Sequence, residues 1–414
     1  MKYIYPTLLE TGNIINSNSW FDIKEHKNHS YNKRKKKRNI NFDYIDTLKI
    51  KLELNDEQKE KILKWLDDFA DVYNMTNQYL KTILTNQNYK KELNFINLRR
   101  TLNDNIKNIC CINNFDKNAA DYGVKHCVEM FKSAFSNHKN INKFNIKNLE
   151  KNRRRKNLVV EPKTVSKKIN SFFSTKLREI TSSLPLNIIT KNSILQYDSY
   201  KKTFIIITPK DENENIQLKQ YRKCGIDIGV RTFLTTYSKN ASYEIGTNTN
   251  QIIDRINKRL DNIKQSKDLN RISNEKYNKL NYKYRDKLSN LIKDMHNKAA
   301  NFLLSNYKTI IIGKVSTKKM VSNLTGNLHD IVKRRLMALS HYRFRMKLHS
   351  MANKFDATIK ETDEYLTSKC CSNCKNIKDN LGSAKLYICT KCNLILDRDI
   401  NASINIYKNR ILSR

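Results

Sequence analysis

The segment Cys371-Ser-Asn-Cys374, followed after fourteen residues by Cys389-Thr-Lys-Cys392, carries the strongest structural signal in this chain of 414 residues. Each Cys-x-x-Cys pair presents two thiolates on one tight turn, and two pairs complete a tetrahedral four-sulfur shell for zinc. A shell without an open coordination position is structural rather than catalytic. We therefore predict one structural Zn²⁺ held by Cys371, Cys374, Cys389 and Cys392. Cys370 leaves a second register open, in which Cys370 replaces Cys371.

Two acidic residues lie in contexts that favour metal binding. The zinc signature runs directly into Asp397-Arg-Asp399, where Asp399 opens the last predicted helix. Far upstream, Gly225-Ile-Asp227-Ile-Gly229 places Asp227 at the end of a buried strand, beside a glycine that leaves room for substrate. Hydrolysis of a phosphodiester by a pair of divalent cations requires carboxylates from several elements. Asp227 and Asp399 fit this role, and Asp397 is interpreted as a neighbour rather than a ligand.

The charge of the chain points to a polyanionic partner. Lys and Arg number 79 against 40 Asp and Glu, which gives a formal net charge of +39. Codon bias accounts for the many Asn and Ile residues, but not for the excess of Lys over Glu. A charge of this size destabilises a compact protein unless a polyanion neutralises it. Nucleic acid is the partner that this charge favours.

The sequence also indicates where in the cell the protein is located. No segment approaches the ~20 apolar residues of a transmembrane helix, and no apolar core of a secretory signal peptide is present, so no membrane partner and no secretion are expected. Nine cysteines, four of them in Cys-x-x-Cys pairs, argue against a disulfide framework and for a reducing compartment. The basic run at 33–38 is a solvated arm, a nuclear-localisation signal, or both. We expect the nucleus, and otherwise the cytoplasm.

In the N-terminal half, residues 1–42 show little periodicity and predict a disordered basic arm. Residues 46–54 alternate apolar and polar side chains, which predicts a strand with one buried face. Asn55 or Asp56 then caps a helix, and further helices fill the chain to about residue 150. Strand-like runs return at 193–197 and 203–208. The early and late strands are interpreted as one β-domain interrupted by helices.

The C-terminal half alternates between strands and helices. Strand 226–228 is followed by a second strand at 232–237. Residues 250–304 predict an antiparallel helical hairpin whose polar faces are exposed to solvent. An apolar strand at 308–312 precedes a helix over 328–354, and another strand follows at 356–361. This alternation favours a mainly parallel sheet.

Three motifs resemble those of a known family. Gly225-Ile-Asp227-Ile-Gly229-Val-Arg231, Leu366-Thr367-Ser368-Lys-Cys-Cys371-Ser-Asn-Cys374 and Asp397-Arg398-Asp399-Ile-Asn401-Ala402 look like the RuvC motifs and the zinc ribbon of the TnpB family. The resemblance implies a fold of class α/β plus all-α, with an RNase H-like (RuvC) nuclease domain, an inserted four-cysteine zinc ribbon and an N-terminal β wedge domain interrupted by a helical recognition lobe. The expected boundaries are 1–42 for the arm, 43–56 and 157–218 for the wedge, 57–156 for the recognition lobe, 219–366 and 393–414 for the nuclease domain, and 367–392 for the ribbon, a domain that binds target nucleic acid.

The resemblance also implies an activity. TnpB proteins are RNA-guided DNA endonucleases encoded by transposons and related to the type V CRISPR effectors. The expected partners are an omega-type guide RNA transcribed beside the gene and double-stranded target DNA with a short flanking motif. The expected reaction is Mg²⁺-dependent phosphodiester hydrolysis at a single RuvC-like site that binds two Mg²⁺ ions.

One position departs from the family pattern. Gly313 stands where the family has its middle glutamate, at the end of strand 308–312. The neighbouring strand ends with Glu361, Asp363 and Glu364, and parallel strands present their carboxyl ends to one crevice. Glu364 matches the relocated glutamate of the eukaryotic and viral branch, called Fanzor, so the resemblance implies Asp227, Glu364 and Asp399 as catalytic Mg²⁺ ligands. Two alternatives stay open: a catalytically dead RNA-guided DNA-binding protein that acts as a repressor, and a guide-free DNA-binding accessory of transposition.

Overall fold

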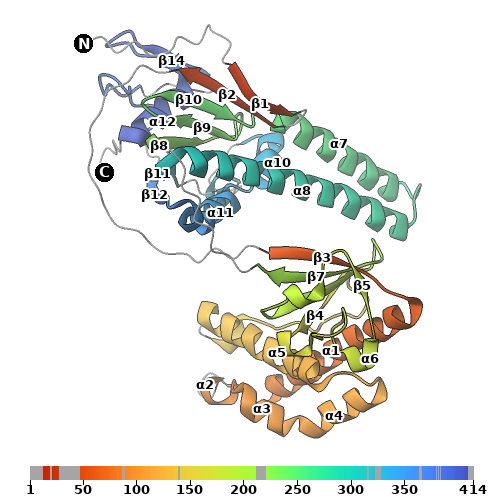
Figure 1. The fold of residues 1–414 in the computed structure, drawn as a ribbon. Helices are drawn as coiled ribbons and strands as arrows, with labels where there is room; N and C mark the ends of the chain where they lie inside the picture. The colour runs from red at the N-terminus through yellow and green to blue at the C-terminus, as the bar shows by residue number, and fades with distance from the viewer. Residues whose placement is uncertain are drawn as a thin grey trace. The chain divides into compact units, whose positions relative to one another are not determined.

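The computed structural model describes residues 13–18, 21–27, 47–85, 89–138, 140–210, 221–314, 317–321, 328–362, 366–378, 380, 382 and 384–408. The chain divides into two compact units (Figure 1). The mixed-sheet unit comprises Met1–Tyr44 and Asn213–Arg414, and the inserted unit comprises Ile45–Glu212. Every described helix lacks the combination of length and apolar character that a membrane span needs.

A mixed sheet forms the centre of the mixed-sheet unit, with its described strands in the order β1-β2-β10-β9-β8-β11-β12. Their bounds are β1 Asn13–Asn18, β2 Phe21–Lys27, β8 Tyr221–Ile228, β9 Leu234–Tyr237, β10 Ala241–Ile245, β11 Tyr307–Gly313 and β12 Thr358–Thr362. Of these described strands, β8, β11 and β12 pair in parallel, whereas the other neighbours are antiparallel. The prediction of a mainly parallel sheet was therefore wrong, because β8, β9 and β10 follow one another through short connections, which impose antiparallel pairing.

The N-terminal segment contributes a hairpin to this sheet. β1 pairs with β2, and β2 pairs with β10 from Lys27 opposite Ala241 to Ile23 opposite Ile245. Ile23 is only 2% exposed and belongs to the core. The prediction of a disordered arm over 1–42 is thus wrong for β1 and β2, because the backbone of β10 supplies hydrogen-bonding partners that no local pattern reveals. The basic run at 33–38 lies outside the described residues.

Helices cover both faces of the mixed sheet. Their bounds are α7 Thr249–Asp268, α8 Asn274–Asn306, α9 Thr317–Val321, α10 Asp330–Leu339, α11 His341–Ala352, η4 Asn353–Phe355 and α12 Arg398–Lys408. One face packs Ile226 and Ile310 against Leu303 of α8 and Leu348 of α11 in a common core. The other face is covered by α12, which packs against β8 and β9.

The helix predicted over 328–354 is two helices. Ser340 takes a left-handed conformation with φ 50°, which ends α10 and begins α11 at a new angle. Immediately after the break, His341 stacks on Phe233 at 5.5 Å between ring centroids. Burial lowers the pKa of His341 to about 3, so the ring is neutral and packs as part of the core.

A second sheet lies in the inserted unit, in the order β4-β6-β7-β3-β5. Its bounds are β3 Thr47–Glu53, β4 Arg155–Val160, β5 Thr181–Ser182, β6 Ser193–Asp198 and β7 Thr203–Pro209. β3 pairs with β7 along its whole length except Glu53. The strand that precedes the helices and the strands that follow them therefore share one sheet.

The helices of the inserted unit pack on one another and on this sheet. Their bounds are α1 Asp56–Ile83, α2 Tyr89–Glu92, α3 Phe95–Thr101, α4 Asn103–Ile112, α5 Lys117–His138, η1 Ile141–Lys143, η2 Pro162–Thr164, α6 Ser174–Leu177 and η3 Leu186–Ile188. Asn55 begins α1 with a capping box, in which its side chain accepts from the N–H of Gln58 and the side chain of Gln58 accepts from the N–H of Asn55. Trp65 on α1 is fully buried.

Candidate active site and zinc ribbon

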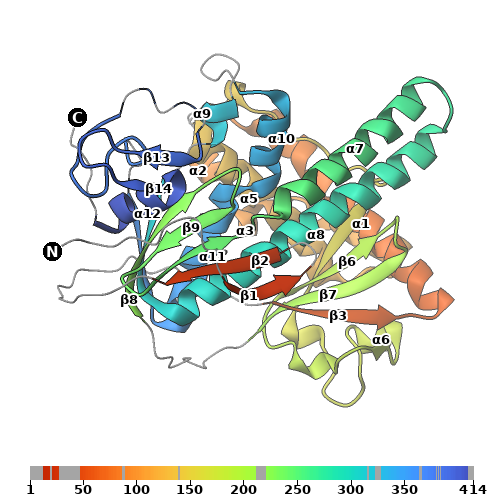
Figure 2. The same ribbon diagram turned by 90° about the horizontal axis from the view of Figure 1, so that it is seen from above.

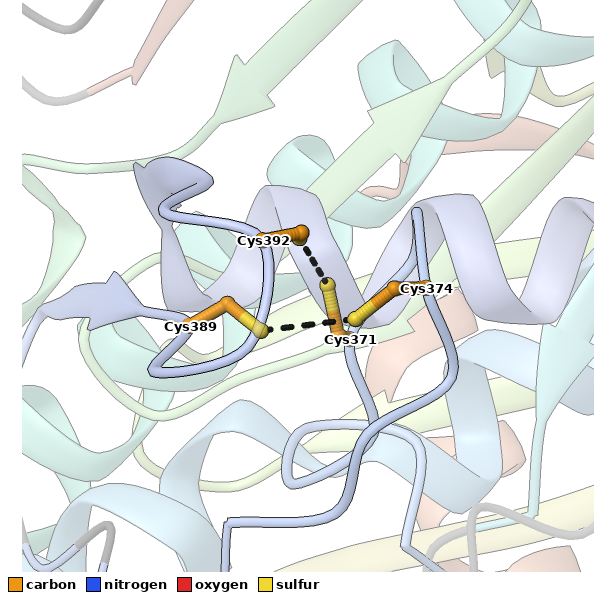
Figure 3. A group of neighbouring side chains, drawn as sticks. All are labelled: Cys371, Cys374, Cys389 and Cys392. Carbon is orange, nitrogen blue, oxygen red and sulfur yellow. Dashed lines mark hydrogen bonds between the residues drawn. The ribbon is translucent and has the colours of Figure 1, made fainter.

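The four predicted zinc ligands come together in one cluster (Figure 3). The sulfur atoms of Cys371 and Cys392 are 3.6 Å apart, and those of Cys374 and Cys389 are 3.5 Å apart. A tetrahedral zinc ion with Zn–S bonds of about 2.3 Å requires sulfur–sulfur distances of about 3.8 Å. All four sulfurs lie within 4.8 Å of one another. The cluster therefore has the dimensions of a closed four-thiolate zinc shell.

The structure also settles the register of the first cysteine pair. The Cys370 sulfur points to backbone carbonyls, with the Lys375 oxygen at 3.7 Å, and does not belong to the cluster. The ribbon itself is built on β13 (Leu386–Ile388) and β14 (Ile395–Asp397), which pair antiparallel. Figure 2 shows both strands beside α12.

Two asparagines attach the ribbon to α12. Asn401 and Asn405 both donate from their side-chain amides to the carbonyl of Cys370, at 2.8 and 2.7 Å. The Asn401 oxygen also accepts from the N–H of Ser372 at 2.9 Å. All three side chains are buried, so these bonds fix the cysteine loop to the helix that carries Asp399. The motif contains Asn401, but the sequence analysis assigned it no role, and it did not single out Asn405.

Asp227 lies on the face of the sheet that α12 covers. A Cβ at Gly225 would lie 2.5 Å from the Ser403 carbonyl and 2.4 Å from the Tyr407 nitrogen, both in α12. Residues two apart on a strand share a face, so Asp227 points to the side of α12 as Gly225 does. Ile226 and Ile228 point into the core on the opposite side.

The strand register places residues of the neighbouring strands level with Asp227, in a row that crosses the sheet. Asp227 pairs with Thr235 of β9, and Thr235 pairs with Glu244 of β10. On the other side, Ile226 pairs with Ile312, which brings Gly313 level with Asp227, and Gly313 pairs with Thr362 of β12. The carboxyl ends of β8, β11 and β12 therefore meet at one level of the sheet.

Asp399 approaches this row from α12. Ser403 lies over Gly225, and Asp399 lies one helical turn before Ser403, a shift of about 6 Å. Asp399 lies close enough to Arg231, just past β8, and to Glu244 of the row for both charges to shift its pKa. Burial raises the pKa of Asp399, and the carboxylate of Asp397 raises it further, whereas Arg231 lowers it. Ionising Asp399 costs free energy because the side chain is half-buried and lies beside a second carboxylate. A bound cation would offset this cost, so these carboxylates fit a metal site.

Asp397 caps the helix that carries Asp399. Its Oδ1 accepts from the N–H groups of Asp399 at 2.8 Å and Ile400 at 3.2 Å, so it caps the start of α12. Its other oxygen lies 3.7 Å from the Lys385 ammonium. Lys385 is also 3.7 Å from Glu244. Glu244 is an acid that the sequence analysis missed, because only the pairing of β10 with β9 brings it beside the site.

The predicted third ligand lies outside the described residues. Glu364 follows Thr362 by two positions, and the structure describes β12 only as far as Thr362. The alternative acid Glu361 faces away from the row, because its carboxylate contacts His349 at 3.0 Å and Arg345 at 3.6 Å, both on α11. Asp363 also lies outside the described residues. Among the residues that the structure describes, the cysteines are the only group of three or more side chains placed to share a metal ion.

A second basic cluster, at 151–156, has acidic partners for Lys151, Arg154, Arg155 and Lys156. Lys151 pairs with Asp71 at 2.7 Å, and Lys156 pairs with Asp67 at 2.6 Å. Arg154 contacts Asp198 at 3.0 Å. These side chains neutralise acids of α1 and β6 and so support the packing of the inserted unit.

The close contact at Gly225 gives a testable prediction. A Gly225→Ala change places a methyl group against helix backbone, which cannot rotate away as a side chain can. We expect a loss of stability of about 1–3 kcal/mol, as for other overpacked sites. Urea unfolding followed by circular dichroism measures this loss. An unchanged midpoint would refute the close approach of α12 to β8.

Two family models match separate parts of the chain. The family model "Cas12f1-like, TNB domain" matches residues 341–406, and "Probable transposase" matches residues 208–324. The chain is 32% identical to the TnpB-like protein L770 of Acanthamoeba polyphaga mimivirus over 97% of this chain and 85% of that protein. The chain belongs to the TnpB-like family.

A second TnpB-like protein and a solved structure match the chain over a similar length. TnpB-like protein R854 of the same virus is 32% identical over 97% of this chain and 84% of its own length. The cryo-EM structure of a Cas12f1–sgRNA–target DNA complex aligns with 89% of this TnpB-like chain and 100% of the solved one, at 14% identity and a TM-score of 0.35.

Proposed function

We propose that this TnpB-like protein is an RNA-guided DNA endonuclease, associated with a transposable element, that hydrolyses target DNA with Mg²⁺ at a single RuvC-like site. The observation that carries the proposal is the placement of Asp227 and Asp399 on one face of the mixed sheet, where β8 ends. Carboxylates on a strand and on a helix can coordinate two cations that lie between them, whereas carboxylates on a single turn cannot reach both cations.

In this proposal Asp227, Glu364 and Asp399 hold two Mg²⁺ ions. Such ions activate water as a nucleophile and neutralise the charge that develops on the phosphate. The Asp397 carboxylate fixes the first turn of α12, and with it Asp399. The zinc ribbon supports the same helix through Asn401 and Asn405, and we assign it to target nucleic-acid binding.

The proposed partners are an omega-type guide RNA and double-stranded DNA with a short flanking motif. The net charge of +39 supports two polyanionic partners. Membership of the TnpB-like family supports an RNA-guided activity. We also propose the Fanzor branch and a nuclear location through residues 33–38; retention of a fluorescent fusion in the cytoplasm would argue against the nuclear signal.

The decisive experiment purifies the protein after expression with the DNA that flanks its gene. We expect a discrete bound RNA, and cleavage of a duplex complementary to its guide in Mg²⁺ but not in EDTA. Copurification without RNA, together with tight binding to bare duplex, would favour the guide-free accessory of transposition instead.

Glu364→Ala tests the third ligand. Loss of one metal-binding carboxylate is expected to slow cleavage by roughly 10³-fold, about 4 kcal/mol of transition-state stabilisation. Glu361→Ala is the matched control, because Glu361 contacts Arg345 and His349 on the other face and should leave cleavage within a few-fold. Single-turnover cleavage rates give the comparison. Full activity of Glu364→Ala would remove this residue from the site.

Gly313 supports one alternative, a protein that binds its target without cutting it. Gly313 lies level with Asp227 and carries no side chain, so a carboxylate is absent from that point of the row. Persistent target binding without nicking by the natural protein would favour this repressor. In that case a Gly313→Glu change, which supplies the acid within the row, is the variant to test for cleavage.

A further inference from the structure

The hairpin of α7 and α8 extends well beyond the sheet (Figure 1). The most N-terminal buried residue of α8 is Ile292, and the last buried residue of α7 is Ile256. Between them, residues 257–291 include no buried side chain. These residues are here called the arm, which is distinct from the basic arm predicted over 1–42. They form two helices that pack mainly on each other, and α10 contacts them near their base, at Asn257 and Asp261.

The arm projects toward the edge of the sheet where the acids lie. α8 leads directly into β11 at Tyr307, so the helix runs back along the strand in the opposite direction. Its packed part, from Ile292 to Asn306, spans about 21 Å, close to the length of β11. The part before Ile292 continues for about 26 Å past the carboxyl ends of the strands, which carry Asp227 and Gly313.

One side of the arm is a stripe of lysines. Lys276, Lys279, Lys283 and Lys287 recur at helical spacing, so they lie on one face of α8. All four are exposed, and no ion pair in the described part of the chain involves them. The stripe spans about 16 Å of helix, comparable to five phosphates of one DNA strand at 3.4 Å each.

The base of the arm is braced. Arg334 of α10 contacts Asp261 of α7 at 2.7 Å, and Arg335 of α10 pairs with Asp254. These ion pairs neutralise two acids of α7 and tie the hairpin to the body of the unit. A braced arm can hold its cations at a defined place, which lowers the entropy cost of binding a strand.

We propose that the lysine stripe binds the phosphate backbone of the DNA strand that enters the acid row. This inference rests on the proposed function, because it takes DNA to be the substrate of Asp227 and Asp399. The stripe, the reach of the arm and its direction support one role: to hold the strand on the carboxyl side of the sheet before it reaches the acids.

The test compares two variants with equal loss of charge. The first is K276A/K279A/K283A/K287A. The control is K51A/K59A/K64A/K107A, whose lysines each lie within 4 Å of a carboxylate, at 3.6, 2.8, 2.9 and 3.6 Å. Fluorescence anisotropy measures the affinity of each protein, as purified with its RNA, for a labelled single-stranded DNA between about 50 and 300 mM salt, a range over which phosphate contacts weaken strongly.

We expect the stripe variant to lose at least about tenfold in DNA affinity, and its slope of log affinity against log salt to become shallower by about 2–3, since each phosphate contact on a single strand contributes about 0.7. The control should keep the slope of the natural protein. Equal slopes for both variants, or a loss confined to binding of a labelled RNA, would overturn the proposal. Because the readout is binding, a natural protein that does not cut DNA would refute the nuclease and still test the arm.

Discussion

Asp227→Asn is expected to slow target cleavage by roughly 10³-fold or more, while the protein still folds and still binds RNA. Asparagine keeps the shape of the side chain but removes the charge that holds a divalent cation. Asp227 is half-buried on the face that α12 covers, so little repacking should follow. Cleavage of a guide-matched duplex under single-turnover conditions measures the rate.

Asp399→Asn should have an effect of the same size, and the double variant should be hardly slower than either single one, because the carboxylates act as one unit. Asp356→Asn is the control: this exposed acid pairs with Lys308 where β11 and β12 begin, at the opposite end of these strands from Gly313 and Thr362, and should leave the rate unchanged. Retained cleavage in either Asp227→Asn or Asp399→Asn would disprove the assigned site. Additive losses would show that the two acids work in separate steps.

Removal of zinc is expected to unfold the ribbon. Structural zinc sites in small domains contribute about 10–16 kcal/mol of apparent binding free energy near neutral pH. The ribbon has a small core of its own, formed by Tyr387 with the cysteines. Without the metal, its lysines, such as Lys375 and Lys391, should become open to trypsin. Elemental analysis should give one zinc per chain for the natural protein.

Cys389→Ser should reproduce this loss without a chelator. The exposed Cys111 lies outside the cluster, so Cys111→Ser is the matched control and should keep both zinc and trypsin resistance. Cleavage should fall along with zinc, because Asn401 and Asn405 join the cysteine loop to the helix that carries Asp399. A zinc-free protein with an intact tryptic pattern would refute a structural metal.

The sequence was sufficient wherever a local pattern has a single physical solution. Cysteine spacing predicted the cluster, and the alternation over 46–54 followed by Asn55 predicted β3 and the start of α1. An acid at the end of an apolar strand predicted the location of Asp227. These features depend on residues close to one another in the chain.

Features that depend on distant pairing could not be predicted in this way. Ile23 is buried only because β2 pairs with β10, more than two hundred residues later. Glu244 lies beside Asp399 only through the register of three strands. The break at Ser340 interrupts a continuous helical pattern, and serine has no strong preference for a left-handed backbone.

The pairing of β2 with β10 has a consequence for synthesis. The ribosome makes β2 before the whole inserted unit and reaches β10 about 215 residues later. At about 5–20 residues per second, the first hairpin waits roughly 10–45 s for its neighbour, long enough for the intervening unit to fold first. During that interval Ile23 has no β10 to pack beside, so this apolar side chain lacks its core until translation has passed residue 245.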